Sequence, residues 1–181
     1  MSAPKLLILD LDETLFHASR QALGLPHDFM VKDYHVYKRP HVAAFIDFCR
    51  ARFRLAVWTS ATEGYAEAMV DELFGAPHDL AFLWSRDHCV TRMDPATYEP
   101  VYIKDLKKVK RKGFDLDLVI ALDDSPEKLQ RNDGNLLRIP PYFGDPADTE
   151  LQNLMPYLDR LREAGNIRAV EKRGWRARGK A

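Results

Sequence analysis

Residues 6–15 read LLILDLDETL, a continuous apolar run that stops at two aspartates, Asp10 and Asp12, with one residue between them. A short apolar run that ends in turn-forming residues is typical of a strand buried on both faces, as in parallel sheets. In open α/β sheets, ligands and reacting groups gather at the carboxyl ends of such strands. We therefore expect Asp10 and Asp12 at the rim of a sheet, where a phosphate and a metal ion could reach them.

Other apolar runs have the same character, and segments with helical periodicity separate them. The runs predict strands at 55–58, 80–84, 118–122 and 136–139. Helices are predicted after Pro40, after an N-cap at Ser60, and over 151–161, where Pro156 should kink or split the helix. Alternating strands and helices indicate an α/β fold of three layers, in which helices cover both faces of a doubly wound, mostly parallel sheet.

The segments outside this core are short. Residues 16–23 should form one or two helical turns, and residues 30–38 predict a peripheral strand or hairpin. Because the segment that ends before Lys38 and the irregular segment that begins at Arg86 are both short, we expect no cap domain comparable to the core, only a small β-hairpin flap and a short insert. A single domain should span 1–164, followed by a basic, flexible tail at 165–181 that is poor in apolar residues.

The composition narrows the class of protein. The 181 residues are 46% hydrophobic, enough for one core, and 27 basic residues balance 27 acidic ones. Nucleic acid is therefore not a favoured partner, although the basic run at 107–112 could steer anionic substrates as a solvated helix face. Cys49 and Cys89 indicate reduced thiols, and neither a signal peptide nor a membrane span is expected. These features predict a cytoplasmic protein without a membrane partner.

Three more polar residues directly follow predicted strands, namely Thr59, Asp123 and Asp124. Right-handed crossovers place the carboxyl ends of all parallel strands on one edge, so these residues should join Asp10 and Asp12 there. Lys104 follows the apolar residues 101–103 closely and can reach the same edge. Four carboxylates at one edge need a counter-charge, because like charges raise each other's pKa.

This set of residues suits phosphoryl chemistry. Oxygen ligands without a nearby histidine or thiolate favour Mg²⁺. A metal ion, a lysine and a hydroxyl group together can neutralise the oxygens of a phosphoryl group during its transfer. One aspartate could then act as the nucleophile, and the other could move protons. The residues alone predict a metal-dependent phosphatase or phosphotransferase.

The segment Asp10-Leu-Asp12-Glu-Thr14 resembles the D-x-D-x-T signature of the haloacid dehalogenase superfamily. Further blocks resemble, in the same order, those of the small CTD phosphatase (NLI-interacting-factor-like) family. They are KRPHV at 38–42, WTSA at 58–61, YIKDL at 102–106, LDDSP at 122–126 and DTEL at 148–151. The likeness runs from about residue 5 to residue 161, and it implies a haloacid dehalogenase-like core.

The resemblance also implies roles for individual residues. Asp10 would be the nucleophile and a metal ligand, and Asp12 the general acid and base, with its main-chain carbonyl on the metal. The further residues it implies are Thr59 and Lys104 on the phosphate, Asp124 on the metal, Asp123 orienting the lysine and metal-bound waters, and Arg86 near the substrate. Ser60 is a candidate phosphate ligand, although an N-cap is its simpler role. Many family members have Asp-Asn where this chain has Asp123-Asp124, and the added charge could tighten metal binding.

The predicted function is a Mg²⁺-dependent phosphomonoesterase that works through an aspartyl-phosphate. A site without a cap suits phosphoserine or phosphothreonine on a protein or peptide, handled by a monomeric enzyme. The resemblance would imply the phosphoserine tail of RNA polymerase as the substrate. Residues 93–100 replace the family's usual substrate-facing loop, so the sequence leaves the identity of the phosphoprotein open. The alternatives are a phosphatase of nucleic-acid ends or small molecules, and a catalytically silent protein-binding module.

Overall fold

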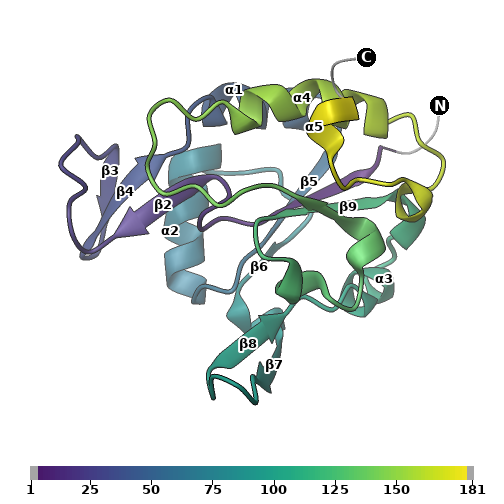
Figure 1. The fold of residues 1–181 in the computed structure, drawn as a ribbon, viewed down its shortest axis with the longest axis horizontal. Coiled ribbons are helices and arrows are strands. Elements are labelled where there is room, and N and C mark those ends of the chain that lie inside the picture. Colours follow the sequence, from purple (N-terminus) through teal and green to yellow (C-terminus); the bar gives the residue numbers. More distant parts are fainter. Residues whose placement is uncertain (1–3, 179–181) are drawn as a thin grey trace.

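A computed structural model describes residues 4–178 (Figure 1). Its central sheet has five parallel strands in the order β10-β9-β1-β5-β6. The strands are β10 (Leu136–Arg138), β9 (Val119–Asp123), β1 (Leu6–Leu9), β5 (Arg54–Trp58) and β6 (Leu83–Trp84). The predicted α/β class is confirmed, although β6 is shorter than the apolar run at 80–84.

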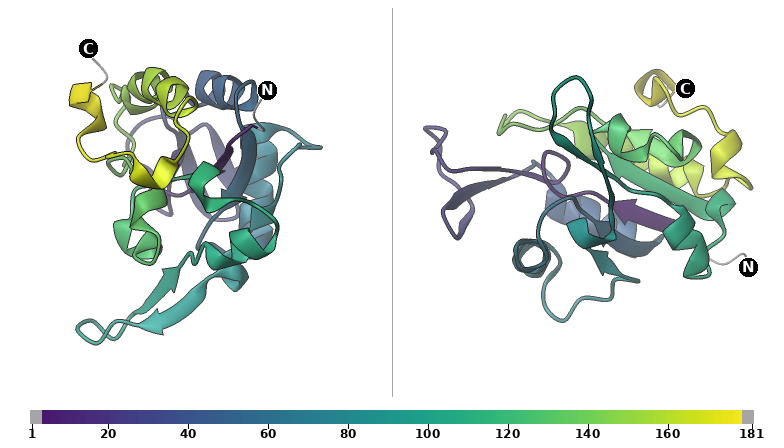
Figure 2. Two further views of the ribbon diagram at one scale, coloured as in Figure 1. Left: turned by 90° about the vertical axis from the view of Figure 1, so that its right-hand side faces the viewer. Right: turned by 90° about the horizontal axis from the view of Figure 1, so that it is seen from below.

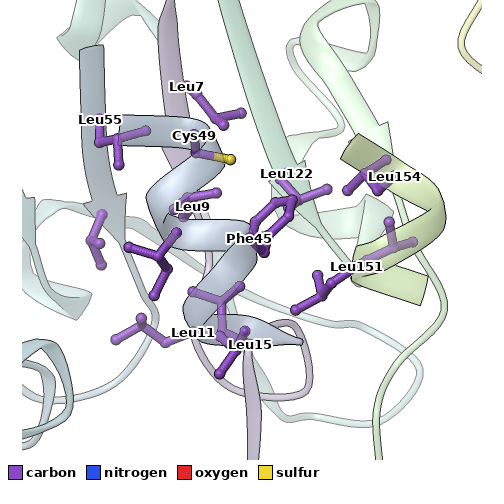
Figure 3. Close-up of a cluster of buried hydrophobic side chains, with 14 of the residues drawn as sticks. Leu7, Leu9, Leu11, Leu15, Phe45, Cys49, Leu55, Leu122, Leu151 and Leu154 are labelled. Carbon is purple, nitrogen blue, oxygen red and sulfur yellow. The ribbon is translucent and has the colours of Figure 1, made fainter. Parts of the chain in front are cut away.

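Both faces of the sheet are buried, because successive side chains of β1 point into different hydrophobic clusters. Leu7 and Leu9 join the first cluster, and Leu6 and Ile8 join the second. Helices α1 (Val42–Arg50), α2 (Glu63–Phe74) and α4 (Glu150–Leu161) pack on the first, while α3 (Lys107–Arg111) and the 3-10 helix η3 (Pro126–Leu129) pack on the second. Figure 3 shows part of the first cluster, with side chains of the sheet, α1 and α4 turned toward one another: Leu7, Leu9, Leu122, Phe45, Cys49, Leu151 and Leu154.

Two small antiparallel sheets project from this core (Figures 1 and 2). Strands β2 (Phe16–Ser19), β4 (Tyr34–Lys38) and β3 (Phe29–Val31) form a three-stranded flap, and β7 (Val90–Met93) pairs with β8 (Pro100–Ile103) in a hairpin. These are the expected flap and insert. The helical turns predicted at 16–23 are wrong, because residues 16–19 form β2 and pair with β4, and the local sequence of β2 does not show this pairing.

Two helices differ from their predictions, one at its first residue and one in its interior. The N-cap position of α2 is Thr62 rather than Ser60, and the Thr62 side chain makes no capping hydrogen bond. In the preceding loop, the Thr59 hydroxyl accepts a hydrogen bond from Ala61 N at 3.0 Å. Helix α4 runs unbroken through Pro156. Pro156 lies on the exposed side of α4, where water can satisfy the carbonyl that loses its partner, while the buried face of the helix stays packed.

The C-terminal segment packs against the core as far as the structure describes it. It contains η5 (Ile167–Ala169) and α5 (Trp175–Arg178). Ile167 and Trp175 are buried in the first cluster, and the Trp175 indole donates to the carbonyl of Arg138 at 3.1 Å. This packing differs from the flexible tail expected from residue 165. Residues 179–181 lie outside the described chain, and the boundary at 164 stays a prediction.

The remaining 3-10 helices are η1 (Arg86–His88), η2 (Leu116–Leu118) and η4 (Asp133–Asn135). Between residues 4 and 178, no helix combines the length and the apolar character that crossing a bilayer requires.

Candidate active site

The carboxyl ends of three neighbouring strands bring the predicted residues to one edge of the sheet. Leu9, the last residue of β1, is in register with Val57 of β5 and Leu122 of β9. Asp10 therefore lies beside Asp123 at the end of β9, and Thr59 follows β5 on the other side. All three are at most 2% exposed. The register of the strands thus fixes which side chains meet.

Lys104 reaches this edge from the end of β8. Its ammonium donates to Asp10 Oδ1 at 2.7 Å and to Asp123 Oδ2 at 2.5 Å, and the residue is 2% exposed. A buried ammonium is stable only where carboxylates and hydrogen bonds compensate its lost hydration. Lys104 and the two aspartates therefore form one mutually dependent group.

Lys128 is a second cation in this group, and the sequence reasoning missed it. Its Nζ lies 3.4 Å from Asp10 Oδ2 and 3.8 Å from Asp123 Oδ1. Burial opposes its charge, but the carboxylates of Asp10, Asp123 and Asp124 outweigh burial and raise the pKa of Lys128 well above its ordinary value. The available signal was its spacing of four residues from Asp124, since one helical turn after a strand end returns a side chain to that end.

The two aspartates of the D-x-D segment differ in their environment. Burial alone would raise the pKa of Asp10, but the ammonium groups of Lys104 and Lys128 outweigh it and hold that pKa below its ordinary value. Burial and the neighbouring charge of Asp10 raise the pKa of Asp12 to about 6. Tyr65 of α2, also missed from the sequence, donates its hydroxyl to Asp12 Oδ1 at 3.0 Å. Asp10 is thus held ionised, while Asp12 can exchange a proton near neutral pH.

The loop after β1 is a tight turn that braces Asp10. Glu13 adopts a φ of 58°, in the left-handed region, and the turn closes with a hydrogen bond from Thr14 N to Leu11 O at 3.1 Å. The Thr14 hydroxyl donates to Asp10 Oδ2 at 3.3 Å. Burial, and then the charges of Asp12, Asp124 and Asp10, raise the pKa of Glu13 to about 7. Thr14 therefore supports the position of Asp10.

Three carboxylates could hold a metal ion. Oxygen atoms of Asp10, Asp123 and Asp124 all lie within 4.8 Å of one another. Asp124 Oδ1 is buried and has no hydrogen-bond partner among the described residues, and burial raises the pKa of Asp124. An all-oxygen donor set with an unsatisfied carboxylate oxygen fits a hard cation such as Mg²⁺.

The remaining predicted residues lie beside this cluster. The Arg86 guanidinium donates to the Ser60 carbonyl at 2.8 Å and lies 4.6 Å from the centre of the Tyr102 ring. In the described chain, neither the Arg86 nor the Ser60 side chain has a hydrogen bond or ion pair with the aspartates. Arg86 therefore fixes the loop after β5 in this structure.

Two further sequence blocks meet through one buried ion pair. Arg39 donates to Asp148 through Nε at 3.0 Å and through Nη2 at 2.8 Å. Its Nη1 also donates to the carbonyls of Thr14 and Pro140, both at 3.1 Å. Arg39 therefore holds the turn after β1 against the loop before α4.

This parallel sheet, with its charged edge, places the protein in the class of haloacid dehalogenase-type phosphatases. The solved structure of Fcp1, an RNA polymerase II CTD phosphatase, matches 91% of the chain with a TM-score of 0.60 and 18% identity, a likeness that shows the fold. The chain covers 51% of that protein's chain. The chain belongs to the NLI interacting factor-like phosphatase family, whose model matches residues 5–168. The resemblance read from the sequence is therefore confirmed, as is the expectation of a phosphatase.

Curated relatives support the same assignment. CTD nuclear envelope phosphatase 1 of Xenopus laevis is 36% identical over 184 residues, which cover 93% of this chain and 72% of the relative. Nuclear envelope morphology protein 1 of Saccharomyces cerevisiae is 30% identical over 187 residues, covering 92% of this chain and 41% of the relative. Both are named for the nuclear envelope, so the expected plain cytoplasmic location is wrong.

Proposed function

We propose that the protein is a Mg²⁺-dependent phosphatase that removes phosphate from phosphoserine or phosphothreonine of a protein through an aspartyl-phosphate on Asp10. The observation that carries this proposal is the ionised Asp10 carboxylate, held between Lys104 and Lys128 beside an Asp12 whose pKa is raised to about 6. Membership of the phosphatase family and the names of the relatives support the substrate class.

In the first step, a carboxylate oxygen of Asp10 attacks the phosphorus of the substrate. The bond from phosphorus to the serine or threonine oxygen breaks, and Asp12 gives its proton to that oxygen. The products of this step are the free hydroxyl of the substrate and a phosphoryl group on Asp10. The raised pKa of Asp12 keeps a useful fraction of it protonated near neutral pH.

In the second step, the now ionised Asp12 takes a proton from water, whose oxygen attacks the same phosphorus. The bond to Asp10 breaks, and inorganic phosphate leaves. Asp10 returns as a carboxylate and Asp12 as an acid, so the cycle closes without any other reactant.

Cations and one hydroxyl group neutralise the phosphoryl oxygens during both steps. Lys104 and Lys128 already flank the Asp10 carboxylate. Because the Thr59 oxygen accepts a hydrogen bond from Ala61 N, its proton is left to donate to a phosphoryl oxygen. Asp10, Asp124 and the main-chain carbonyl of Asp12 would hold Mg²⁺, with Asp123 fixing Lys104. When bound, the metal ion supplies further positive charge to the phosphoryl group.

The place of action and the assembly state are part of the same proposal. The relatives named for the nuclear envelope favour action at that membrane system. We also propose a monomer, because residues of one chain supply every group that the two steps need. Sedimentation at micromolar concentration would contradict the monomer if it gave twice the mass of the chain.

Hydrolysis of an aryl phosphate tests the core of the proposal. Activity should require Mg²⁺, disappear on chelation and return when Mg²⁺ is added again. Asp10→Asn should abolish it. Phosphoserine peptides should be better substrates than sugar phosphates. Full activity of Asp10→Asn would contradict the nucleophile, and equal turnover of sugar phosphates and phosphopeptides would contradict the substrate class.

A further inference from the structure

A group of cations lies on α3, directly after the catalytic lysine. Five of the six residues at 107–112 are basic. Val109 is fully buried in the second hydrophobic cluster and fixes the helix to the sheet. Four side chains are exposed and form what we call the basic patch: Lys107, Lys110, Arg111 and Lys112. Lys108 is separate, since its ammonium donates to the carbonyl of His88 at 2.7 Å.

The charge of the basic patch is not neutralised within the described chain. The nearest carboxylates in sequence have partners outside the patch: Asp105 pairs with Arg131 at 2.7 Å, Asp115 accepts a hydrogen bond from Asp117 N at 3.0 Å, and Asp117 lies 3.7 Å from Arg168. Across residues 4–178, no ion pair involves any of the four patch residues. Because the whole chain has as many acidic as basic residues, this excess reflects local segregation of charge. Such a surface raises the local concentration of anions.

Helix α3 leads away from the carboxyl end of β8, so Lys107 is the patch residue nearest to Lys104 along the chain and Lys112 is the farthest. Helix α3 begins three residues after Lys104, whose main-chain N donates to Lys128 O at 2.7 Å. Three residues span at most roughly 11 Å, and a five-residue helix is about 7.5 Å long. An extended peptide advances about 3.3 Å per residue. The patch therefore lies within reach of about six residues of an extended peptide whose phosphate is at Asp10.

We infer that the basic patch docks an acidic segment of the phosphoprotein substrate, a few residues away from the phosphorylated side chain. The inference rests on the proposed protein phosphatase function and names its preferred substrates. A peptide that carries a phosphate and nearby carboxylates matches both the catalytic edge and the patch in charge. Because the patch lies within this short span of Lys104, a segment of the substrate itself is favoured over a membrane surface or a nucleic acid.

The test compares two phosphoserine peptides of equal length. One carries Asp and Glu three to six residues from the phosphoserine on both sides, and the other carries Asn and Gln there. The wild-type chain should prefer the acidic peptide by about tenfold in kcat/KM at low salt, and the preference should shrink as salt rises. Lys110→Gln/Arg111→Gln/Lys112→Gln should lose most of the preference while keeping its kcat/KM for an aryl phosphate.

A matched control removes the same number of charges elsewhere. Arg138→Gln/Arg160→Gln/Arg173→Gln changes three exposed cations outside α3, and it should keep the preference for the acidic peptide. Equal turnover of both peptides by the wild-type chain, or an unchanged preference in the patch variant, would overturn the inference. Failure of both peptides in an enzyme that cleaves aryl phosphate would instead defeat the protein phosphatase function itself.

A membrane surface or a nucleic acid as the partner of the basic patch would give a different experimental result. Binding to vesicles containing about one third phosphatidylserine, or to single-stranded DNA, can be measured with the same two variants. A patch variant that loses either binding but keeps its preference for the acidic peptide would overturn the inference in favour of that partner. Loss of the peptide preference alone supports docking of the substrate.

Discussion

At the scale of single residues, the same side chain acquires different chemistry from its surroundings. Asp10 and Asp12 are two residues apart, yet paired ammonium groups lower the pKa of the first, while burial and the charge of Asp10 raise that of the second. In the proposed mechanism, this difference allows one carboxylate to attack and the other to carry a proton.

Replacing Lys128 tests the cation that the sequence did not reveal. Lys128→Gln should lower kcat/KM for an aryl phosphate by about 100-fold, because one of the charges that faces the phosphoryl group is lost. Lys128→Arg keeps the positive charge and should retain much more activity. Steady-state kinetics on both variants decide the matter, and equal activity of wild type and Lys128→Gln would remove Lys128 from the mechanism.

Replacing Tyr65 tests the role of Asp12 as the proton donor, because it should change how kcat/KM depends on pH. The Tyr65 hydrogen bond stabilises ionised Asp12, so Tyr65→Phe should raise the pKa of Asp12 further. The first step needs protonated Asp12, and kcat/KM in the wild type should therefore decline as pH rises above about 6. In Tyr65→Phe the decline should shift to higher pH. A shift to lower pH would contradict the role of Asp12 as the acid.

The sequence predicted the residues that directly follow strands, because a strand end and its turn are local features. Asp10, Thr59 and Asp123 are of this kind. Lys128 and Tyr65 were missed because each lies inside a helix, and only the packing of that helix turns its side chain toward the aspartates. Arg86 was expected near the substrate from the family likeness, and in the structure its guanidinium donates a hydrogen bond to the Ser60 carbonyl.

At the scale of elements, apolar runs predicted the strands well, whereas capping residues and prolines predicted the helices less well. A buried parallel strand needs only a short apolar run, so β1, β5 and β9 were visible in the sequence. Strand β2 was not visible, because its conformation depends on pairing with β4 across the flap and not on an apolar run of its own. The prediction of an N-cap at Ser60 was wrong because the loop after β5 continues past this residue, and α2 begins only at Glu63.

The Arg39–Asp148 ion pair joins two of these elements and should affect stability. Asp148→Asn leaves the guanidinium of Arg39, 1% exposed, without its counter-ion and should lower the free energy of unfolding by about 3 kcal/mol at neutral pH. Although burial opposes it, pairing with Arg39 lowers the pKa of Asp148 below 3.8. The stabilisation is therefore present above about pH 4 and is lost as pH falls through the lowered pKa.

Urea unfolding of wild type and Asp148→Asn at several pH values measures this effect. The difference in the free energy of unfolding should be largest near neutral pH and shrink in acid. Asp159→Asn is the control, since its pair with Arg52 is exposed and should contribute at most about 1 kcal/mol. A difference that grows as the pH falls would contradict the assigned sign.

At the scale of the whole molecule, the parallel sheet assembles a site from distant parts of the chain. Asp10, Lys104 and Asp123 meet although the chain between them forms most of the fold. The alternation of strands and helices predicted this assembly. It could not predict the packing of the C-terminal segment, because Ile167 and Trp175 are isolated apolar residues in a polar sequence.

The packing of Trp175 is open to a direct stability test. Trp175 is 4% exposed and lies against Tyr157 with the ring centres 5.7 Å apart. Trp175→Ala should lower the free energy of unfolding by about 3 kcal/mol through lost burial and the cavity left behind. Tyr98→Ala, at a residue that is 80% exposed, should change it by less than about 0.5 kcal/mol. Thermal unfolding that ranked the two variants in the opposite order would contradict the packing of this segment.

The central claim is that Asp10 carries the phosphoryl group, and trapping that intermediate tests it most directly. Asp12→Asn should still be phosphorylated by an aryl phosphate, whose leaving group needs little help from an acid. It should then stall, because no base is left to activate water. With Mg²⁺ present and a rapid acid quench, intact mass and peptide mapping should find one phosphoryl group on Asp10. A phosphoryl group on any other residue, or rapid turnover by this variant without a trapped intermediate, would contradict the account.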